Sequence, residues 1–237
     1  MLKRPIDVIL ASVALVFTAP LMAVAAIGIR LSSPGPIFYC ASRVGINGRL
    51  FVMYKFRTMH VRTVVRSVVT AQEDSRVFPF GRLLRRTKID ELPQLLNILK
   101  NEMSIVGPRP EDPSFVKRYA PEHLQTLSVL PGLASPGSIY NCTHGEMLID
   151  SADPEQDYVN RLLPTKLALE AVYVRQASVF YDLRLMFRAL WVIIGRALGR
   201  RHFPEPPEMK MASYLTRSAL SAQQSTPALS ADGSIRT

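Results

Sequence analysis

Two adjacent carboxylates, Asp90 and Glu91, are the side chains of this sequence best suited to chemistry. They stand at the start of a predicted helix, closely preceded by four basic residues: Arg82, Arg85, Arg86 and Lys88. A helix N-terminus and positive surroundings keep a carboxylate ionised and attract phosphate. An ionised Asp90 can attack phosphorus, or the pair can hold Mg²⁺ against a diphosphate. The spacing alone favours a plainer alternative, in which the two residues only begin a helix.

Three further cations are candidates for binding an anionic substrate. Arg109 stands between Pro108 and Pro110, which hold its backbone stiffly and suit it to bidentate contact with a phosphate. A structural salt bridge would look the same in the sequence. Lys55 and Arg57 are two residues apart, so an extended segment places both on one face. Their predicted targets are the phosphates of a nucleotide or, alternatively, lipid headgroups.

An apolar run over residues 8–29 carries no charge and has Pro20 in its middle. About 22 helical residues rise about 33 Å, enough to cross a hydrocarbon core of about 30 Å. Pro20 should bend the helix into arms of about 18 and 15 Å, neither of which spans alone. Basic residues flank both ends, and both flanks therefore favour the cytoplasmic side. We predict a re-entrant membrane hairpin bent at Pro20, with a straight span and a buried helix as the alternatives.

Asp7 lies at the edge of this run, where an unpaired charge is costly. We expect it to pair with Arg4 or Arg30. A helix cap at the membrane interface is the alternative.

The composition restricts the class of partner. The formal net charge of +10 calls for an anionic partner, and beside a membrane anchor it indicates attraction to the headgroups of the cytoplasmic leaflet. Cys40 and Cys142 are far apart and indicate neither a zinc site nor a disulfide framework. The sequence contains no phosphate-binding loop, dinucleotide fingerprint or nucleophile elbow. Nucleic-acid binding would rest on charge alone, so we predict no nucleic-acid partner.

The predicted elements fall into three parts: a membrane hairpin over residues 1–34, a catalytic domain at the cytoplasmic face over 35–201, and a disordered tail over 202–237. Within the domain, strands at 37–39 and 50–56 form a hairpin, and a short basic helix at 81–87 precedes a helix over 90–101. Residues 62–74 are a loop or short helix, 113–127 are helical, and 134–141 are extended. Two long helices follow. The first, over 158–179, can pack on the core of the domain as well as lie in the headgroup plane, and the second, over 182–198, suits the headgroup plane.

Many separate motifs of the chain, in order, resemble the bacterial sugar transferase family, the monotopic polyprenyl-phosphate phosphoglycosyl transferases. The resemblance runs from about residue 2 to residue 198. It is carried by Lys3-Arg4, Asp7, Pro20-Leu21, Ser33-Pro34-Gly35-Pro36, Arg43-Val44-Gly45, Tyr54-Lys55-Phe56-Arg57-Thr58-Met59, Gly81-Arg82-Leu83-Leu84-Arg85, Asp90-Glu91-Leu92-Pro93-Gln94-Leu95 and Val106-Gly107-Pro108-Arg109-Pro110. The chain departs from the family pattern at Ala19, Lys88 and Asn101, none of which is a catalytic group. In length it resembles the small, core-only members.

The resemblance implies transfer of sugar-1-phosphate from a UDP-sugar to polyprenyl (undecaprenyl) phosphate, with release of UMP, at the cytoplasmic face of the bacterial inner membrane. It further implies that Asp90 is the nucleophile, forming a covalent phosphosugar intermediate, and that Glu91 helps to hold Mg²⁺. Arg85 and Arg109 match positions that bind phosphate or substrate, and Lys55 and Arg57 match a recurrent basic motif.

The predicted fold class is α/β, mostly α-helical, in a monotopic membrane enzyme that begins polysaccharide or glycoconjugate synthesis. Its expected parts are a re-entrant helix-break-helix, a small β-hairpin, catalytic helices and interfacial amphipathic helices. Membrane lipids and a second copy in a homodimer are further expected partners. The competing hypothesis is a basic membrane-surface binding or scaffold protein without catalysis. The motifs are compatible with hexose, N-acetylated and deoxyamino sugar donors.

Overall fold

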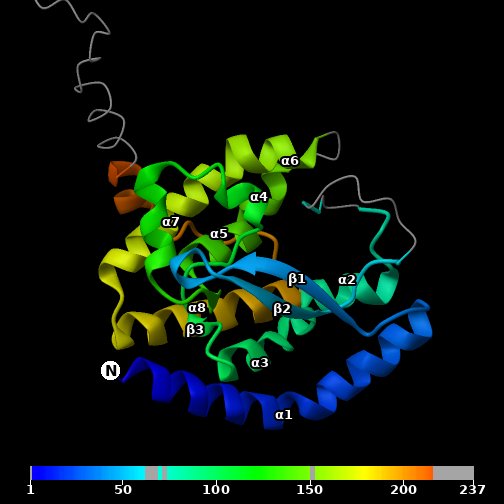
Figure 1. Cartoon of the computed structure of the whole chain (residues 1–237). Helices are drawn as coiled ribbons and strands as arrows, with labels where there is room; N and C mark the ends of the chain where they lie inside the picture. The colour runs from blue at the N-terminus through cyan, green and yellow to red at the C-terminus, as the bar shows by residue number, and fades with distance from the viewer. Residues whose placement is uncertain (1, 62–68, 71–73, 150–152, 216–237) are drawn as a thin grey trace, which may run out of the picture.

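The computed structural model describes residues 2–61, 69–70, 74–149 and 153–215. The described chain is mostly helical and includes two small two-stranded sheets (Figure 1). This agrees with the predicted mostly helical class. Most of the segment over 62–74, for which a loop or short helix is predicted, lies outside the described residues.

The N-terminal apolar run is a single long helix, α1 (Lys3–Ser32), with Pro20 inside it. Figure 1 shows that α1 changes direction about half-way along its length. The helix is continuous through this bend, so the predicted helix-break-helix is a bent helix without a break. In the described part of the chain, α1 is the one helix long and apolar enough to cross a membrane.

Both ends of α1 are attached to the rest of the molecule. Near its start, Asp7 is buried and accepts hydrogen bonds from Ser104 Oγ (2.7 Å) and from the backbone N of Ile105 (3.1 Å). Just after its end, Ser33 accepts a hydrogen bond from the guanidinium of Arg57. The predicted pairing of Asp7 with an arginine of its own segment is therefore wrong, because the carboxylate meets backbone and hydroxyl donors of another element. It is no helix cap either, since α1 begins at Lys3.

The predicted hairpin is confirmed: its second strand has the predicted bounds, and its first strand is longer than the sequence indicated. β1 (Phe38–Val44) and β2 (Leu50–Phe56) are antiparallel and are joined through a short 3₁₀ turn, η1 (Ile46–Gly48). Ala41 lies opposite Met53, and both are buried against α1 and the helix α3 (Gln94–Leu99). The hairpin and α1 thus sandwich α3, which follows the acidic pair.

The acidic pair lies on a short 3₁₀ element, η2 (Ile89–Glu91), between α2 (Pro79–Arg86) and α3. Lys88 and Asn101, at the two ends of the η2–α3 unit, have left-handed backbone conformations with φ of 58° and 63°. β3 (Ser104–Val106) then runs parallel to β4 (Gly132–Ala134), and the Pro-Arg-Pro turn follows β3 directly. The predicted single helix over 90–101 is therefore a 3₁₀ turn followed by a short α-helix.

Two segments after the turn differ from the prediction. Residues 113–127 form a short helix, α4 (Pro113–Val116), and a separate 3₁₀ helix, η3 (Pro121–Ser128). Residues 134–141, predicted as extended, are mostly helical in α5 (Pro136–Thr143). Ser135 caps this helix and Pro136 occupies its first turn, a combination that favours helix initiation. A short 3₁₀ helix, η4 (Gly145–Leu148), follows.

The two long helices near the C-terminus are confirmed, with shifted boundaries. α6 (Pro154–Asp157) and a π-helical turn, η5 (Tyr158–Leu162), lead into α7 (Leu163–Gln176), which is largely buried. α8 (Val179–Ala197) follows. Residues 202–215, predicted as part of a disordered tail, instead pack on these helices: Glu208 pairs with Arg188 of α8, and Ala212 is buried against α7. The remainder of that tail, residues 216–237, lies outside the described residues.

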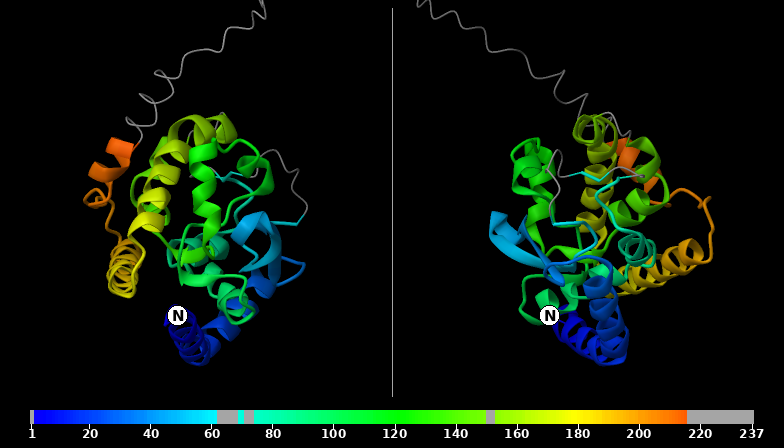
Figure 2. Two further views of the ribbon diagram at one scale, coloured as in Figure 1. Left: turned by 60° about the vertical axis from the view of Figure 1, so that its left-hand side comes forward. Right: turned by 90° about the vertical axis from the view of Figure 1, so that its right-hand side faces the viewer.

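Large apolar side chains are exposed along α1 and α8, which lie in the lower part of the molecule in Figures 1 and 2, whereas α6 and α7 lie in the upper part. We call these side chains the apolar face. Its members on α1 are Ile9, Val13, Val16, Phe17, Leu21, Val24, Ile27 and Leu31, and those on α8 are Val179, Phe180, Leu183, Phe187, Leu190, Trp191 and Ile194.

Candidate active site

Asp90 is buried at the turn between α2 and α3, with only 7% of its surface exposed. Its Oδ1 atom has no hydrogen-bond partner among the residues that the structure describes. The preceding Lys88 has a left-handed backbone, a conformation that costs free energy in a non-glycine residue and is enriched at functional sites. Asp90 therefore carries a buried carboxylate oxygen whose hydrogen-bonding capacity is not used by the described residues.

Glu91 is surrounded by three cations from three different parts of the chain. Its Oε1 atom lies 2.7 Å from Arg109, 3.4 Å from Lys55 Nζ and 3.7 Å from Lys88 Nζ. Lys55 comes from β2, Lys88 from the turn before η2, and Arg109 from the turn after β3. The acidic pair is thus the point at which the hairpin, the α2–α3 connection and the Pro-Arg-Pro turn meet.

The charges of the two carboxylates are set by opposing effects. Burial raises the pKa of Asp90, and the adjacent Glu91 raises it further, while the nearby lysines lower it. Burial also acts to raise the pKa of Glu91, but Arg109, Lys55 and Lys88 together hold that pKa well below its usual range. Burial lowers the pKa of Lys55 to about 8, although Glu91 opposes this change. Glu91 is therefore firmly ionised, and the ionisation of Asp90 depends on the positive charge around it.

Most of the residues predicted for the site are brought together. Lys55 and Arg109 contact Glu91 directly, and Arg85 lies close enough to lower the pKa of Asp90 while its Nε donates to Thr58 Oγ1 at 2.7 Å.

Arg57 is placed differently from the other predicted cations. Its guanidinium is nearly buried and donates to Ser33 Oγ and to the backbone oxygens of Ser33, Pro36 and Met59. Alternate residues of an extended strand do share a face, but β2 ends at Phe56, so Arg57 leaves the face on which Lys55 lies. In this structure Arg57 fastens the segment after α1 to the end of β2.

Gln94 is a site residue that the motif analysis did not single out. It is fully buried one helical turn after Asp90, and its Oε1 accepts a hydrogen bond from Arg109 at 3.3 Å. Arg109 also reaches the backbone oxygen of Leu133 at 3.4 Å. The signal that could have identified it is its spacing in the predicted helix over 90–101, because an amide four residues after Asp90 would share a helical face with it.

The family model for bacterial sugar transferases matches residues 1–196 of this chain. The chain belongs to this family.

Three curated relatives illustrate how far the similarity of this sugar transferase extends. A UDP-glucose:undecaprenyl-phosphate glucose-1-phosphate transferase of Caulobacter vibrioides is 35% identical over 192 residues, which cover 79% of this chain and 68% of the relative. An Aeromonas hydrophila UDP-N-acetylgalactosamine-undecaprenyl-phosphate N-acetylgalactosaminephosphotransferase is 32% identical over 197 residues, covering 81% and 44%. The exopolysaccharide production protein ExoY of Rhizobium meliloti is 33% identical over 206 residues, covering 80% and 84%.

The family identifies this sugar transferase as an enzyme and rejects the competing hypothesis of a scaffold without catalysis. The chain spans less than half of the Aeromonas relative, about two thirds of the Caulobacter relative and most of the Rhizobium relative.

The two carboxylates of the acidic pair differ in how far the described residues engage them. Asp90 Oδ1 is unpartnered, whereas Glu91 Oε1 is already shared by three cations. The described residues contain no group of three or more His, Cys, Asp or Glu side chains placed to hold a metal ion. Mg²⁺ commonly binds through one or two carboxylates plus substrate phosphates, a mode that needs fewer protein ligands than such a group.

Proposed function

We propose that this sugar transferase moves a sugar-1-phosphate from a UDP-sugar to a polyprenyl phosphate, releasing UMP, at the cytoplasmic face of the bacterial inner membrane. The observation that carries the proposal is the unpartnered, buried oxygen of Asp90 amid the cations that surround Glu91. A free carboxylate oxygen in a positive, partly desolvated site is suited to attack phosphorus and to attract two anionic substrates in turn. The names of the relatives supply the substrate classes.

In the first step, Asp90 Oδ1 attacks the phosphorus next to the sugar. The bond from that phosphorus to the bridging oxygen of the diphosphate breaks, and UMP leaves with the electron pair. Asp90 then carries the phosphosugar as an acyl phosphate. Arg109 and Lys55, already directed at Glu91, are placed to offset the charge that moves onto the departing phosphate.

In the second step, an oxygen of the polyprenyl phosphate attacks the same phosphorus. The bond between Asp90 and phosphorus breaks, so the carboxylate is regenerated and the product is a polyprenyl diphosphate-linked sugar. Because both steps take place at one phosphorus, which Asp90 holds between them, the soluble and the lipid substrate can use a single site one after the other. Asp90 and Glu91 would hold Mg²⁺ with oxygens of the diphosphate, and the ion would supply positive charge against that group.

The attachment of both ends of α1 to one domain supports a re-entrant anchor. Lys3 pairs with Asp182 of α8, and Asp7 binds β3, while Gly28 lies against Phe80 of α2. A straight span would place the two ends of the helix about 30 Å apart on opposite sides of a membrane. The bend at Pro20 instead lets the apolar face of α1 enter one leaflet beside that of α8.

The activity is tested by incubating the membrane-reconstituted protein with Mg²⁺, undecaprenyl phosphate and a panel of UDP-sugars, and measuring UMP. The names of the relatives make UDP-glucose and UDP-N-acetylgalactosamine the first donors to test. We expect UMP with at least one donor. Failure with every donor of a broad panel would contradict the proposal.

A further inference from the structure

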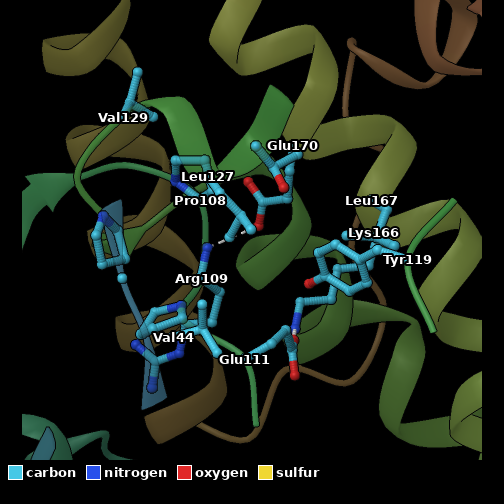
Figure 3. A pocket seen from close by; sticks show the side chains of 14 residues that line it. Val44, Pro108, Arg109, Glu111, Tyr119, Leu127, Val129, Lys166, Leu167 and Glu170 are labelled. Carbon is cyan, nitrogen blue, oxygen red and sulfur yellow. Dashed lines mark hydrogen bonds and ion pairs between the residues drawn. The ribbon is translucent and has the colours of Figure 1, made fainter. Parts of the chain in front are cut away.

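Glu170 is a buried acid on α7 that the proposed chemistry does not use. Only 2% of its surface is exposed, and its Oε1 atom accepts two hydrogen bonds, from the backbone N of Arg109 (3.2 Å) and from Ser135 Oγ (2.6 Å). Figure 3 shows the carboxyl group directed at the backbone of Arg109. The residue whose side chain holds Glu91 is therefore held at its backbone by α7.

This contact depends on a close approach of α5 to α7. A Cβ atom added to Gly137 would lie 2.6 Å from Glu170 Oε1, closer than real Cβ contacts, so the carboxyl group fits only because residue 137 is glycine. Ser135 caps α5 by accepting from the backbone N of Ser138 while its hydroxyl donates to Glu170. The start of α5, the Pro-Arg-Pro turn and α7 thus converge on one carboxyl oxygen.

The two carboxyl oxygens of Glu170 have different surroundings. Oε2 has no partner in the part of the chain that the structure describes, and Glu170 lines a cavity of about 10 Å³, roughly the room that one water molecule requires (Figure 3). Burial raises the pKa of Glu170 to about 7. Since Oε1 is occupied by two donors, a proton on this acid belongs on Oε2. The contact with Arg109 can then be made in either protonation state.

Other charged groups near Glu170 are engaged with one another. Lys166, one turn earlier on α7, pairs with Glu111, which also accepts from Tyr158 at 2.6 Å. Tyr119, between α4 and η3, lines the same cavity as Glu170. None of these contacts replaces the acceptor that Glu170 provides for the backbone of Arg109.

We propose that Glu170 is a positioning residue, which fixes the backbone of Arg109 and thereby aims its guanidinium at Glu91. The carboxyl oxygen, the backbone N–H and the guanidinium form one continuous path from α7 to the acidic pair. The role rests on the proposed function insofar as it concerns catalysis, whereas the placement of Arg109 can be tested without activity.

The test compares Glu170→Gln, which keeps the acceptor oxygen, with Glu170→Leu, which removes it. Gly137→Ala is a second disruptive variant, because it displaces Oε1 while keeping the carboxyl group. Leu169→Ala is the matched control, since Leu169 is fully buried on the same helix and packs with Ala212, away from Arg109. We measure kcat and KM for the donor, the melting temperature, and the rate at which phenylglyoxal modifies Arg109, followed by peptide mass spectrometry.

We expect Glu170→Leu and Gly137→Ala to lower kcat about 10- to 100-fold with a smaller change in KM, the scale on which misplacing a catalytic group acts. Arg109 should react faster with phenylglyoxal in both. Glu170→Gln should resemble the wild type in kcat and in labelling, and Leu169→Ala should lower the melting temperature without changing the labelling of Arg109.

Wild-type labelling of Arg109 in both disruptive variants would overturn the inference, as would a loss of kcat no greater than that of the control. The labelling result decides the inference even if no donor releases UMP, so failure of the proposed function is seen separately.

Discussion

The contact of Asp7 with β3 predicts a measurable contribution to stability. Replacing Asp7 by Ala removes an acceptor that is 5% exposed and leaves the backbone N–H of the half-buried Ile105 without this partner. The hydroxyl of Ser104 also donates to the backbone oxygen of Val106 at 3.0 Å, so it keeps one acceptor. The main loss is therefore one charge-assisted hydrogen bond and one unpaired amide.

A hydrogen bond to a charged group contributes about 1.5–3 kcal/mol, and an unsatisfied buried donor costs about 1–3 kcal/mol. We therefore expect Asp7→Ala to lower the free energy of unfolding by about 3 kcal/mol. For a chain of this size that corresponds to a fall of about 6–12 °C in melting temperature. Asp7→Asn keeps an oxygen for Ile105 and should cost about 1 kcal/mol.

The assay is thermal unfolding of the purified, detergent-solubilised protein, followed by circular dichroism at fixed pH and detergent concentration. The order wild type, Asn variant, Ala variant is the expected result. Equal melting temperatures for all three proteins would refute the role of Asp7 in fastening α1 to β3.

Three other outcomes follow from the structure. Burial raises the pKa of Glu170 from its usual 4.5 to about 7. The stability that the protonated Glu170 contributes is therefore fully present below about pH 4.5 and is lost as the pH rises through 7, and the pKa shift corresponds to about 3 kcal/mol in the free energy of unfolding. Unfolding of Glu170→Gln should lack this pH dependence. Phe187→Asp on the exposed surface of α8 should reduce quenching of Trp191 fluorescence by brominated lipids, whereas Leu50→Asp on the hairpin should not. Leu50 is a matched control because the two side chains are similarly exposed, Phe187 to 72% and Leu50 to 64%. Equal quenching in both variants would contradict membrane contact by α8. Gly28→Val should destabilise the protein by about 1–3 kcal/mol, because a Cβ at this position would lie 2.4 Å from an aromatic ring of α2; an unchanged melting temperature would contradict this packing.

The sequence predicted the acidic pair and its main cations because their motifs are local and chemically distinctive. Asp90 and Glu91 adjoin one another, and Arg109 is fixed between two prolines, so residue type and spacing alone identified them as candidates. Lys55 also reaches Glu91, but this contact depends on how the hairpin packs beside α3. The local motif around Lys55 carries no information about that packing.

Tertiary contacts decided the features that the sequence did not predict. Asp7 binds a strand nearly one hundred residues away, and Arg57 serves the end of α1. Glu170 lies in a helix for which core packing was one of two open alternatives, and its partner Arg109 is 61 residues away in the sequence. For residues 134–141 a local signal was present, because Ser135 before Pro136 is a good helix start.

The direct test of the central claim is intact-protein and peptide mass spectrometry after incubation with a UDP-sugar and Mg²⁺ in the absence of polyprenyl phosphate. We predict a gain of one sugar-phosphate on the peptide that contains residue 90, loss of this adduct when polyprenyl phosphate is added, and no adduct in Asp90→Asn. UMP release that requires both substrates at once, with no adduct on Asp90, would contradict it.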